Sequence, residues 1–222
     1  MTGEKKTSLS RRSFALGAGG AIALLGLGGT LKLVGSEPVC RPPGGQDEDA
    51  FIGACLRCEK CREICPNHAL IPTRIEQGLL NARTPTFDFK KGWCDYCAEA
   101  YEGIPQCVAV CPTEALRLPA DATPETVILG KAFIVEEWCL GWQLRGCRRC
   151  LDECPYEAIE LDAYDRPVVI AEKCNGCGKC ELVCISMMGG SLYRGATDRA
   201  ITIKPAETVE QLLKEQTGGG AA

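Results

Sequence analysis

The sequence predicts an α+β fold of small modules, in which short helices and strands are arranged around groups of cysteines. Two observations support this prediction. Sixteen of the 17 cysteines among the 222 residues fall between Cys55 and Cys184, and short apolar runs alternate with turn residues between them. A unit this rich in Cys and Gly buries too little apolar surface to fold without disulfides or bound metal.

The charge balance and the histidine count exclude two broad classes. Lys and Arg number 25 and Asp and Glu 29, which gives a net charge of −4. A nucleic-acid-binding domain normally carries a basic surface, so we expect no nucleic-acid partner. The chain has one histidine, His68, which excludes a His-rich metal site.

Residues 1–35 have the layout of a twin-arginine export signal. The pair Arg11 and Arg12 precedes Ser13–Leu31, an uncharged run rich in Gly and Ala. A positive segment before an apolar run is typical of export signals, and an Arg pair marks the twin-arginine route. Because no A-x-A-like site follows, the run is either cleaved elsewhere or kept as an anchor, and its length of about 28 Å suits a bilayer. The sequence therefore predicts a periplasmic protein, with retention of the signal left open.

The rest of the chain divides by composition. Residues 36–50 are rich in Pro, Gly and acidic residues and are interpreted as a linker. Cys40 stands alone in this linker and is predicted to be a free thiol, not a metal ligand. Residues 51–205 form the cysteine-rich region, and residues 206–222 are expected to form a C-terminal helix and a flexible tail.

The remaining sixteen cysteines form four motifs of four. Motif one is Cys55, Cys58, Cys61 and Cys65; motif two is Cys94, Cys97, Cys107 and Cys111; motif three is Cys139, Cys147, Cys150 and Cys154; motif four is Cys174, Cys177, Cys180 and Cys184. Motifs one and four have the C-x2-C-x2-C-x3-C spacing that bacterial ferredoxins use for [4Fe–4S] clusters. The fourth cysteine of each such motif ligates the neighbouring cluster, so the motifs work in pairs.

This spacing favours iron–sulfur clusters over the alternatives. Two-residue gaps let three thiolates curl around one face of a cubane, and the x3 gap places the fourth cysteine at the start of a helix. Zinc ribbons use two separate C-x2-C pairs, and a disulfide scaffold does not suit three cysteines so close together. The sixteen cysteines are therefore predicted to ligate four [4Fe–4S] clusters.

Other segments repeat with the cysteines. Motifs one, two and three are each followed by Pro-x-x-Ala-(Leu/Ile), which predicts a helical turn that leads into a strand. A hairpin is expected from Ala158–Leu161 and Val168–Ile170, which flank a turn-prone segment. Such short units suit tandem or nested ferredoxin-like modules. His68 lies in the first of these turns and is interpreted as a solvated spacer.

This combination of motifs resembles the NapG/MauM family of ferredoxin-type proteins. The resemblance is carried by the twin-arginine leader, the Arg-Pro-Pro-Gly segment at 41–44, the x9 gap of motif two and the Cys139-x7-Cys147 opening of motif three. Cys40 directly before the Arg-Pro-Pro-Gly segment and the long loop at 99–106 depart from the pattern, which leaves the partner open but not the cofactor.

The resemblance implies an electron carrier, not an enzyme. Its expected electron donor is a membrane-bound, quinol-oxidising iron–sulfur protein, through which the chain is also membrane-associated. The expected acceptor is a c-type cytochrome or a periplasmic reductase, with the nitrate reductase pathway preferred. The alternatives are the methylamine utilisation counterpart and an iron–sulfur subunit of a molybdopterin-type oxidoreductase.

The pairing of the motifs has two solutions. Sequential pairing joins motif one with two and three with four, as the short gap between Cys154 and Cys174 suggests. Nested pairing joins motif one with four and two with three, as in similar iron–sulfur subunits, and it suits a pairing of strands 114–118 and 132–135. We prefer the nested scheme, in which Cys184 joins Cys55, Cys58 and Cys61.

Overall fold

The computed structural model describes residues 37–97, 103–143, 145–188 and 191–218. The predicted export signal, with Arg11, Arg12 and the uncharged run, lies outside these residues. Over the parts of the chain that are described, no helix has the length and apolar character needed to cross a membrane.

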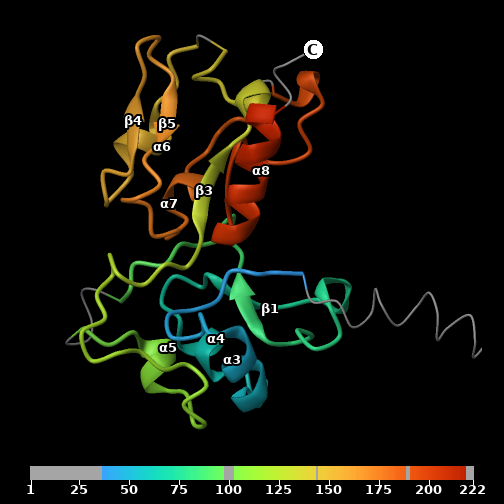
Figure 1. Cartoon of the computed structure of the whole chain (residues 1–222), viewed down its shortest axis with the longest axis vertical. Helices are drawn as coiled ribbons and strands as arrows, with labels where there is room; N and C mark the ends of the chain where they lie inside the picture. Colours follow the sequence, from blue (N-terminus) through green and yellow to red (C-terminus); the bar gives the residue numbers. More distant parts are fainter. Residues whose placement is uncertain (1–36, 98–102, 144, 189–190, 219–222) are drawn as a thin grey trace, which may run out of the picture.

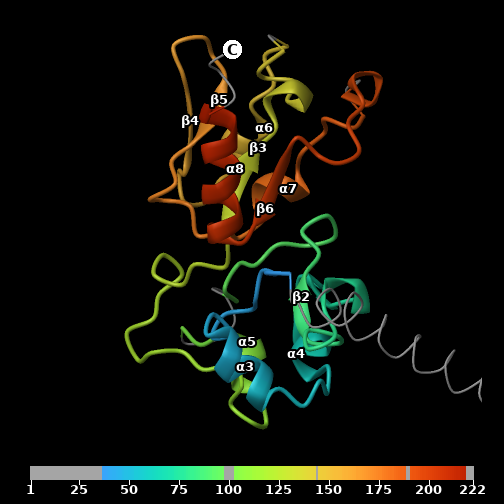
Figure 2. The same ribbon diagram turned by 45° about the vertical axis from the view of Figure 1, so that its right-hand side comes forward.

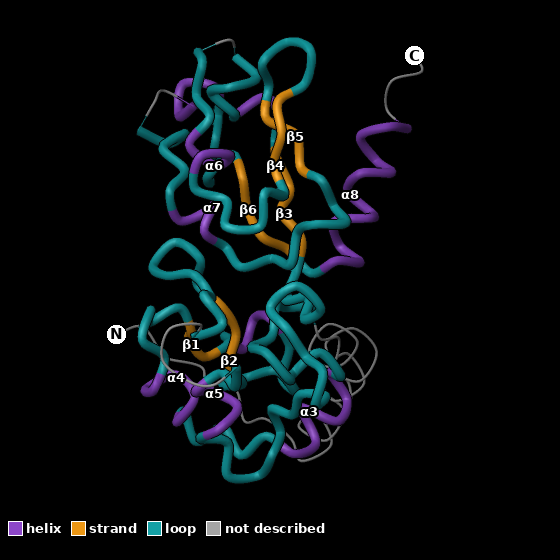
Figure 3. Tube along the Cα trace, turned by 90° about the vertical axis from the view of Figure 1, so that its left-hand side faces the viewer, coloured by secondary structure: helices purple, strands orange, loops and turns teal. Residues whose placement is uncertain are grey.

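The chain folds into two lobes, one above the other along the long axis (Figures 1 and 3). We call residues 37–118 the N-terminal module and residues 131–218 the C-terminal module, with 119–130 as the connecting segment. Each module contains two cysteine motifs, motifs one and two in the first and three and four in the second.

Among the residues that the structure describes, three two-stranded antiparallel sheets give the modules their frame. In the N-terminal module, β1 (Leu70–Pro72) pairs with β2 (Pro85–Phe87). In the C-terminal module, β3 (Lys131–Ile134) pairs with β6 (Ile201–Lys204), and β4 (Ile159–Leu161) pairs with β5 (Pro167–Val169). The predicted hairpin is thus confirmed as β4–β5.

The helices within the described residues are mostly single turns that carry cysteines. They are α3 (Glu48–Ala54), α4 (Lys60–Ile64), α5 (Gln106–Ala109), α6 (Arg149–Asp152), α7 (Lys179–Leu182) and α8 (Ala206–Gly218), with 3-10 turns η2 (Ile75–Gln77), η3 (Glu136–Trp138) and η4 (Ser191–Arg194). The longest of these described helices, α8, packs along β3 (Figure 2). The arrangement is the expected mixture of short helices and strands.

The expected pairing of residues 114–118 with 132–135 is wrong. β3 pairs instead with β6, which follows motif four, and residues 114–118 form no strand. The segment at 115–117 is held by the linker, because the N–H of Arg117 donates to the carbonyl of Gly44 at 3.0 Å. The sheet therefore closes motifs three and four into one module.

Residues 37–50 pack as part of the N-terminal module, although their composition is that of a linker. The guanidinium group of Arg41 is buried and donates to both carboxylate oxygens of Glu48, to Thr84 Oγ1, to the carbonyl of Pro85 and to Asn81 Oδ1. It also stacks 4.8 Å from the centre of the Phe51 ring. This network joins the segment to α3 and to the loop before β2.

Candidate functional site

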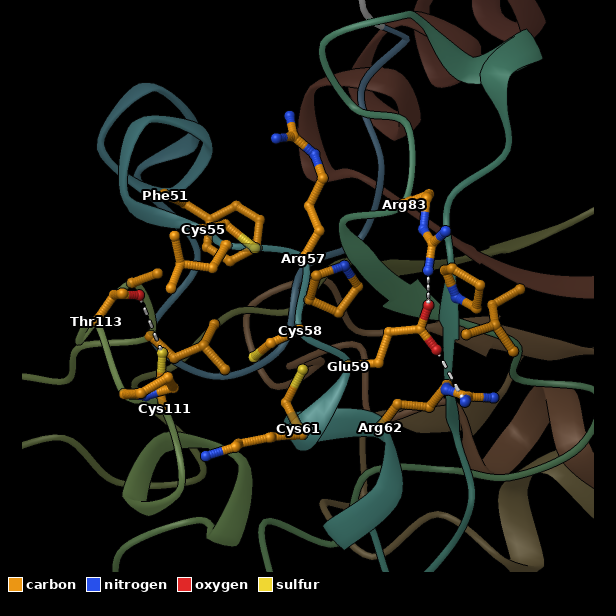
Figure 4. A pocket seen from close by; sticks show the side chains of 18 residues that line it. Phe51, Cys55, Arg57, Cys58, Glu59, Cys61, Arg62, Arg83, Cys111 and Thr113 are labelled. Carbon is orange, nitrogen blue, oxygen red and sulfur yellow. Dashed lines mark hydrogen bonds and ion pairs between the residues drawn. The ribbon is translucent and has the colours of Figure 1, made fainter.

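The first cysteine group combines motif one with the last cysteine of motif two. Cys55, Cys58, Cys61 and Cys111 line one cavity, together with Phe51 of α3 and residues that follow α5 (Figure 4). Cys58 is exposed, and Glu59 at the cavity edge pairs with Arg62 at 2.8 Å and with Arg83 at 2.7 Å. We call this set group I.

Two further cavities lie in the C-terminal module, and each is lined by four cysteines. Cys139, Cys147, Cys150 and Cys184 line one cavity, which we call group III. Cys174, Cys177, Cys180 and Cys154 line the other, which we call group IV. In both cavities three cysteines come from one motif and the fourth from its partner motif.

The fourth set is recognised from the electrostatic neighbours of its thiols. Burial raises the pKa of Cys107 well above its ordinary value, and Cys94, Cys97, Cys61 and Cys65 raise it further. Burial likewise raises the pKa of Cys94, where Cys97 and Cys65 contribute in the same direction. Cys94, Cys97, Cys107 and Cys65 are therefore neighbours, and we call this set group II.

The nested pairing is wrong, and the sequential pairing holds. Cys184 lies beside Cys139, Cys147 and Cys150, not beside Cys55, Cys58 and Cys61. The physical reason is helix packing within each module, where α4 contacts α5 and α6 contacts α7. Each of these helices carries the third cysteine of its motif, so each pair of motifs closes on itself.

The fourth cysteine of each motif lies at or directly after the C-terminal end of a helix, so the expectation that it begins a helix is wrong. The third cysteine lies inside the helix, and the three-residue gap spans about one helical turn. Cys65 is the C-cap of α4, and Cys184 directly follows Val183, the C-cap of α7. The turn carries the fourth thiol away from its own motif and towards the partner motif.

The Pro-x-x-Ala repeat forms the same turn three times. The residue before Ala is left-handed in each copy, with φ of 48° at His68, 51° at Glu114 and 48° at Glu157. In each copy its N–H donates to the carbonyl of the fourth cysteine. The turn aims later N–H groups at the thiol, as in Ala158 N–H to Cys154 Sγ at 3.3 Å.

Hydrogen bonds to sulfur lower one thiol pKa below its ordinary value. Burial raises the pKa of Cys111, but the N–H groups of Leu116, Thr113 and Ala115 and the Thr113 hydroxyl outweigh it, so the net shift is downward. Donors aimed at a thiolate favour its charged form, which is the form that ligates metal.

The donor sets fit [4Fe–4S] clusters better than single metal ions. All seventeen cysteines are free thiols. Within the described residues, no three Cys, His, Asp or Glu side chains are close enough to hold one ion. In groups I, III and IV the four thiols instead surround a cavity, which is the arrangement that a cubane with one cysteine per iron requires.

Cys40 lines none of these three cavities. It is buried in the same apolar core as Phe89, Ala132 and Ile203, and its carbonyl accepts a hydrogen bond from Thr86 Oγ1 at 2.8 Å. Burial raises the pKa of Cys40 to about 12, so the thiol stays neutral and packs as a small apolar side chain.

Sequence reasoning missed the importance of two glycines in motif four. Gly176 and Gly178 have φ of 80° and 85°, and the equivalent positions of motif one, Arg57 and Glu59, are left-handed as well. The sequence did contain a signal for this. Motifs one and four have identical spacing, but motif four has Gly at the two positions where motif one has long side chains.

Known proteins match both the cysteine region and the larger part of the chain. A family model described as "4Fe-4S dicluster domain" matches residues 145–187. The ferredoxin-type protein NapG of Escherichia coli is 36% identical over 65% of this chain, and the match spans 65% of that protein, less than two thirds of its length. The methylamine utilization ferredoxin-type protein MauM of Methylobacillus flagellatus is 35% identical over 66% of this chain and 64% of its own length.

A shorter relative is covered more fully. The ferredoxin-type protein NapF of Escherichia coli is 32% identical over 65% of this chain, and the match spans 79% of its length. The resemblance drawn from the motifs is thus confirmed by overall identity, and the match to a dicluster domain supports [4Fe–4S] clusters. The chain belongs to the family of ferredoxin-type proteins that includes NapF, NapG and MauM.

Proposed function

We propose that this chain is an electron-transfer protein that relays electrons through four [4Fe–4S] clusters. The clusters supply one-electron redox chemistry when bound, and the protein spaces them and tunes their potentials. The proposed ligands are the cysteines of group I (Cys55, Cys58, Cys61, Cys111), group II (Cys94, Cys97, Cys107, Cys65), group III (Cys139, Cys147, Cys150, Cys184) and group IV (Cys174, Cys177, Cys180, Cys154).

The observation that carries this proposal is the shared geometry of the groups. In groups I, III and IV, three cysteines of one motif and one cysteine of its partner face the same cavity. Group II completes the set with the same three-plus-one composition. A two-cluster ferredoxin exchanges its fourth ligands in the same way, so each module corresponds to one such unit.

The partners and the location are proposed from the family. The electron donor would be a membrane-bound, quinol-oxidising iron–sulfur protein, and the acceptor a c-type cytochrome or a periplasmic reductase, with nitrate reduction as the preferred pathway. The similarity to MauM favours methylamine utilisation as the second candidate. The chain would act as a carrier and leave the catalysis to its partners.

Iron content tests the cluster count directly. Anaerobically reconstituted protein is expected to bind about sixteen iron atoms per chain, because four groups each hold four. Cys40→Ser should leave this value unchanged, since Cys40 lines none of the three cysteine cavities. Iron near eight atoms, or zinc in place of iron, would contradict the proposal, as would a reduced protein without a cluster EPR signal.

Export is proposed to follow the twin-arginine route. The change of Arg11 and Arg12 together to Lys is expected to leave the protein in the cytoplasm with its clusters intact, because twin-arginine substrates fold and load before transport. Fractionation followed by immunoblotting and iron analysis measures this. Continued appearance of the double variant in the periplasm would argue for another route.

A further inference from the structure

The motif-four loop is built into the N-terminal module. The N–H of Cys94, a group II residue, donates to the carbonyl of Cys177, a group IV residue, at 2.8 Å. Asn175 is held on both sides by the connecting segment. Its carbonyl accepts from the Leu129 N–H at 2.7 Å, and its Nδ2 donates to the Pro124 carbonyl at 2.7 Å.

Steric contact with neighbouring segments, and not the positive φ alone, explains why these two positions of the loop are glycine. A methyl group at Gly178 would overlap the Phe89 ring of the N-terminal module, and one at Gly176 would lie 2.5 Å from the backbone N of Gly130. In motif one, the equivalent left-handed positions carry Arg57 and Glu59, so the backbone conformation itself tolerates side chains. Glycine is required at these two positions because the connecting segment lies too close to Gly176, and the N-terminal module too close to Gly178, for a side chain.

Apolar and cation–π contacts lie around the hydrogen bond between Cys94 and Cys177. Phe89 stacks on Phe87 with ring centres 4.7 Å apart and is buried with Cys174 and Cys180 in one core. The Lys179 ammonium lies 4.6 Å from the centre of the Trp93 ring, so the residues next to Cys94 and Cys180 also touch across the junction.

The neighbours of individual thiols give the order of the groups in space. Cys107 of group II has Cys61 of group I among its neighbours, and Cys180 of group IV has Cys150 of group III. The hydrogen bond from Cys94 to Cys177 joins group II to group IV. The spatial order is therefore I, II, IV, III, which differs from the order along the chain.

We propose that the Cys94–Cys177 backbone contact is the crossing by which electrons pass between the modules, with Gly176, Gly178 and Phe89 as the positioning residues that keep it short. The proposal rests on the four-cluster function above. It makes groups I and III the two ends of the relay, so the donor and the acceptor would approach opposite ends of the molecule.

Gly178→Ala tests the crossing, with Gly146→Ala as its matched control. Gly146 is also left-handed, with φ of 64°, and precedes the group III residue Cys147, but an added methyl there meets nothing within 4 Å. Both variants thus strain a ligand loop of the same module, and only Gly178→Ala forces the modules apart.

Two measurements are made on the full-length, loaded protein. Hydrogen–deuterium exchange of the peptide that contains the Cys94 amide reports the contact itself. Gly178→Ala is expected to raise this exchange about tenfold, the equivalent of about 1.4 kcal/mol, because one interface hydrogen bond is lost. The magnetic coupling between clusters in the EPR spectrum of the reduced protein should weaken, while Gly146→Ala leaves both signals as in the wild type.

A second variant, Phe89→Ala, distinguishes loss of the contact between the modules from damage to the group IV loop. Phe89→Ala opens space on the other side of the junction and changes no residue of a cysteine motif. Because the effects of contacting residues are not additive, the double variant with Gly178→Ala should exchange no faster than Phe89→Ala alone. Equal effects of Gly178→Ala and Gly146→Ala, or additive effects of Gly178→Ala and Phe89→Ala, would overturn the proposal. Iron near eight atoms in the wild type would instead defeat the four-cluster function while leaving the exchange result valid.

Discussion

Cys184→Ser is expected to lower the iron content from about sixteen to about twelve atoms per chain, because the loss of one thiolate releases one cluster. The affected cluster is group III, in which Cys184 lines the same cavity as Cys139, Cys147 and Cys150. Iron and acid-labile sulfide are determined on protein reconstituted anaerobically.

Double variants that include Cys184→Ser test which cysteine motifs pair with each other. Cys184→Ser combined with Cys139→Ser should still hold about twelve iron atoms, since both residues belong to one group, whereas Cys184→Ser combined with Cys55→Ser should hold about eight. The nested scheme predicts the reverse. A third result, with every double variant near eight, would mean that the groups do not form the sets seen in the structure.

The sequence was sufficient to predict the cysteine motifs and the hairpin, because both depend on local spacing. Two-residue gaps and turn residues act over fewer than ten positions, so the β4–β5 hairpin at 159–169 could be recognised without any tertiary information. The left-handed turn after each Cys-Pro is equally local and recurs at His68, Glu114 and Glu157.

The pairing of the motifs could not be predicted in the same way. Sequential and nested schemes use identical motifs and differ only in where the fourth cysteine of each motif points. The helix contacts that bring the motifs together are joined in the C-terminal module by the β3–β6 pair, which links residues about seventy positions apart and whose second strand is Ile201–Lys204. Strand pairing at this separation depends on tertiary packing, on which local propensity gives little information.

The role of Arg41 in holding residues 37–50 to the N-terminal module could not be predicted, for a different reason. Pro, Gly and charged residues at 36–50 are typical of a linker, and composition alone predicts no more than that. In the structure, Pro42 and Pro43 are fully buried and Arg41 is 3% exposed. A single buried guanidinium group with several acceptors makes this segment part of the folded module and not a linker. The local sequence pattern does not reveal those acceptors, because they lie up to 44 residues away.

Arg41→Ala is expected to cause the largest loss of stability among substitutions outside the cysteine groups, about 3 kcal/mol, because it leaves buried acceptors without a donor. Asn81 and Thr84 are fully buried and both accept hydrogen bonds from this guanidinium group. The side chain of Glu48 is 36% exposed and can be solvated again, so the main cost falls on the other acceptors. Urea unfolding under anaerobic conditions, followed by visible absorption, measures the shift.

Two further variants separate the network from charge alone. Arg41→Lys keeps the charge but replaces a planar fork with a single ammonium group that cannot reach Glu48, Thr84 and Asn81 together, so most of the loss should remain. Arg117→Ala removes a guanidinium group whose ion pair with Glu114 is 74% exposed on both sides, and it should change stability by less than about 0.5 kcal/mol. Full stability of Arg41→Lys would show that charge is sufficient, and equal losses for Arg41→Ala and Arg117→Ala would show that the buried network contributes nothing of its own. The expected result, a large loss for both Arg41 variants and almost none for Arg117→Ala, would establish that residues 37–50 fold as part of the first cluster module.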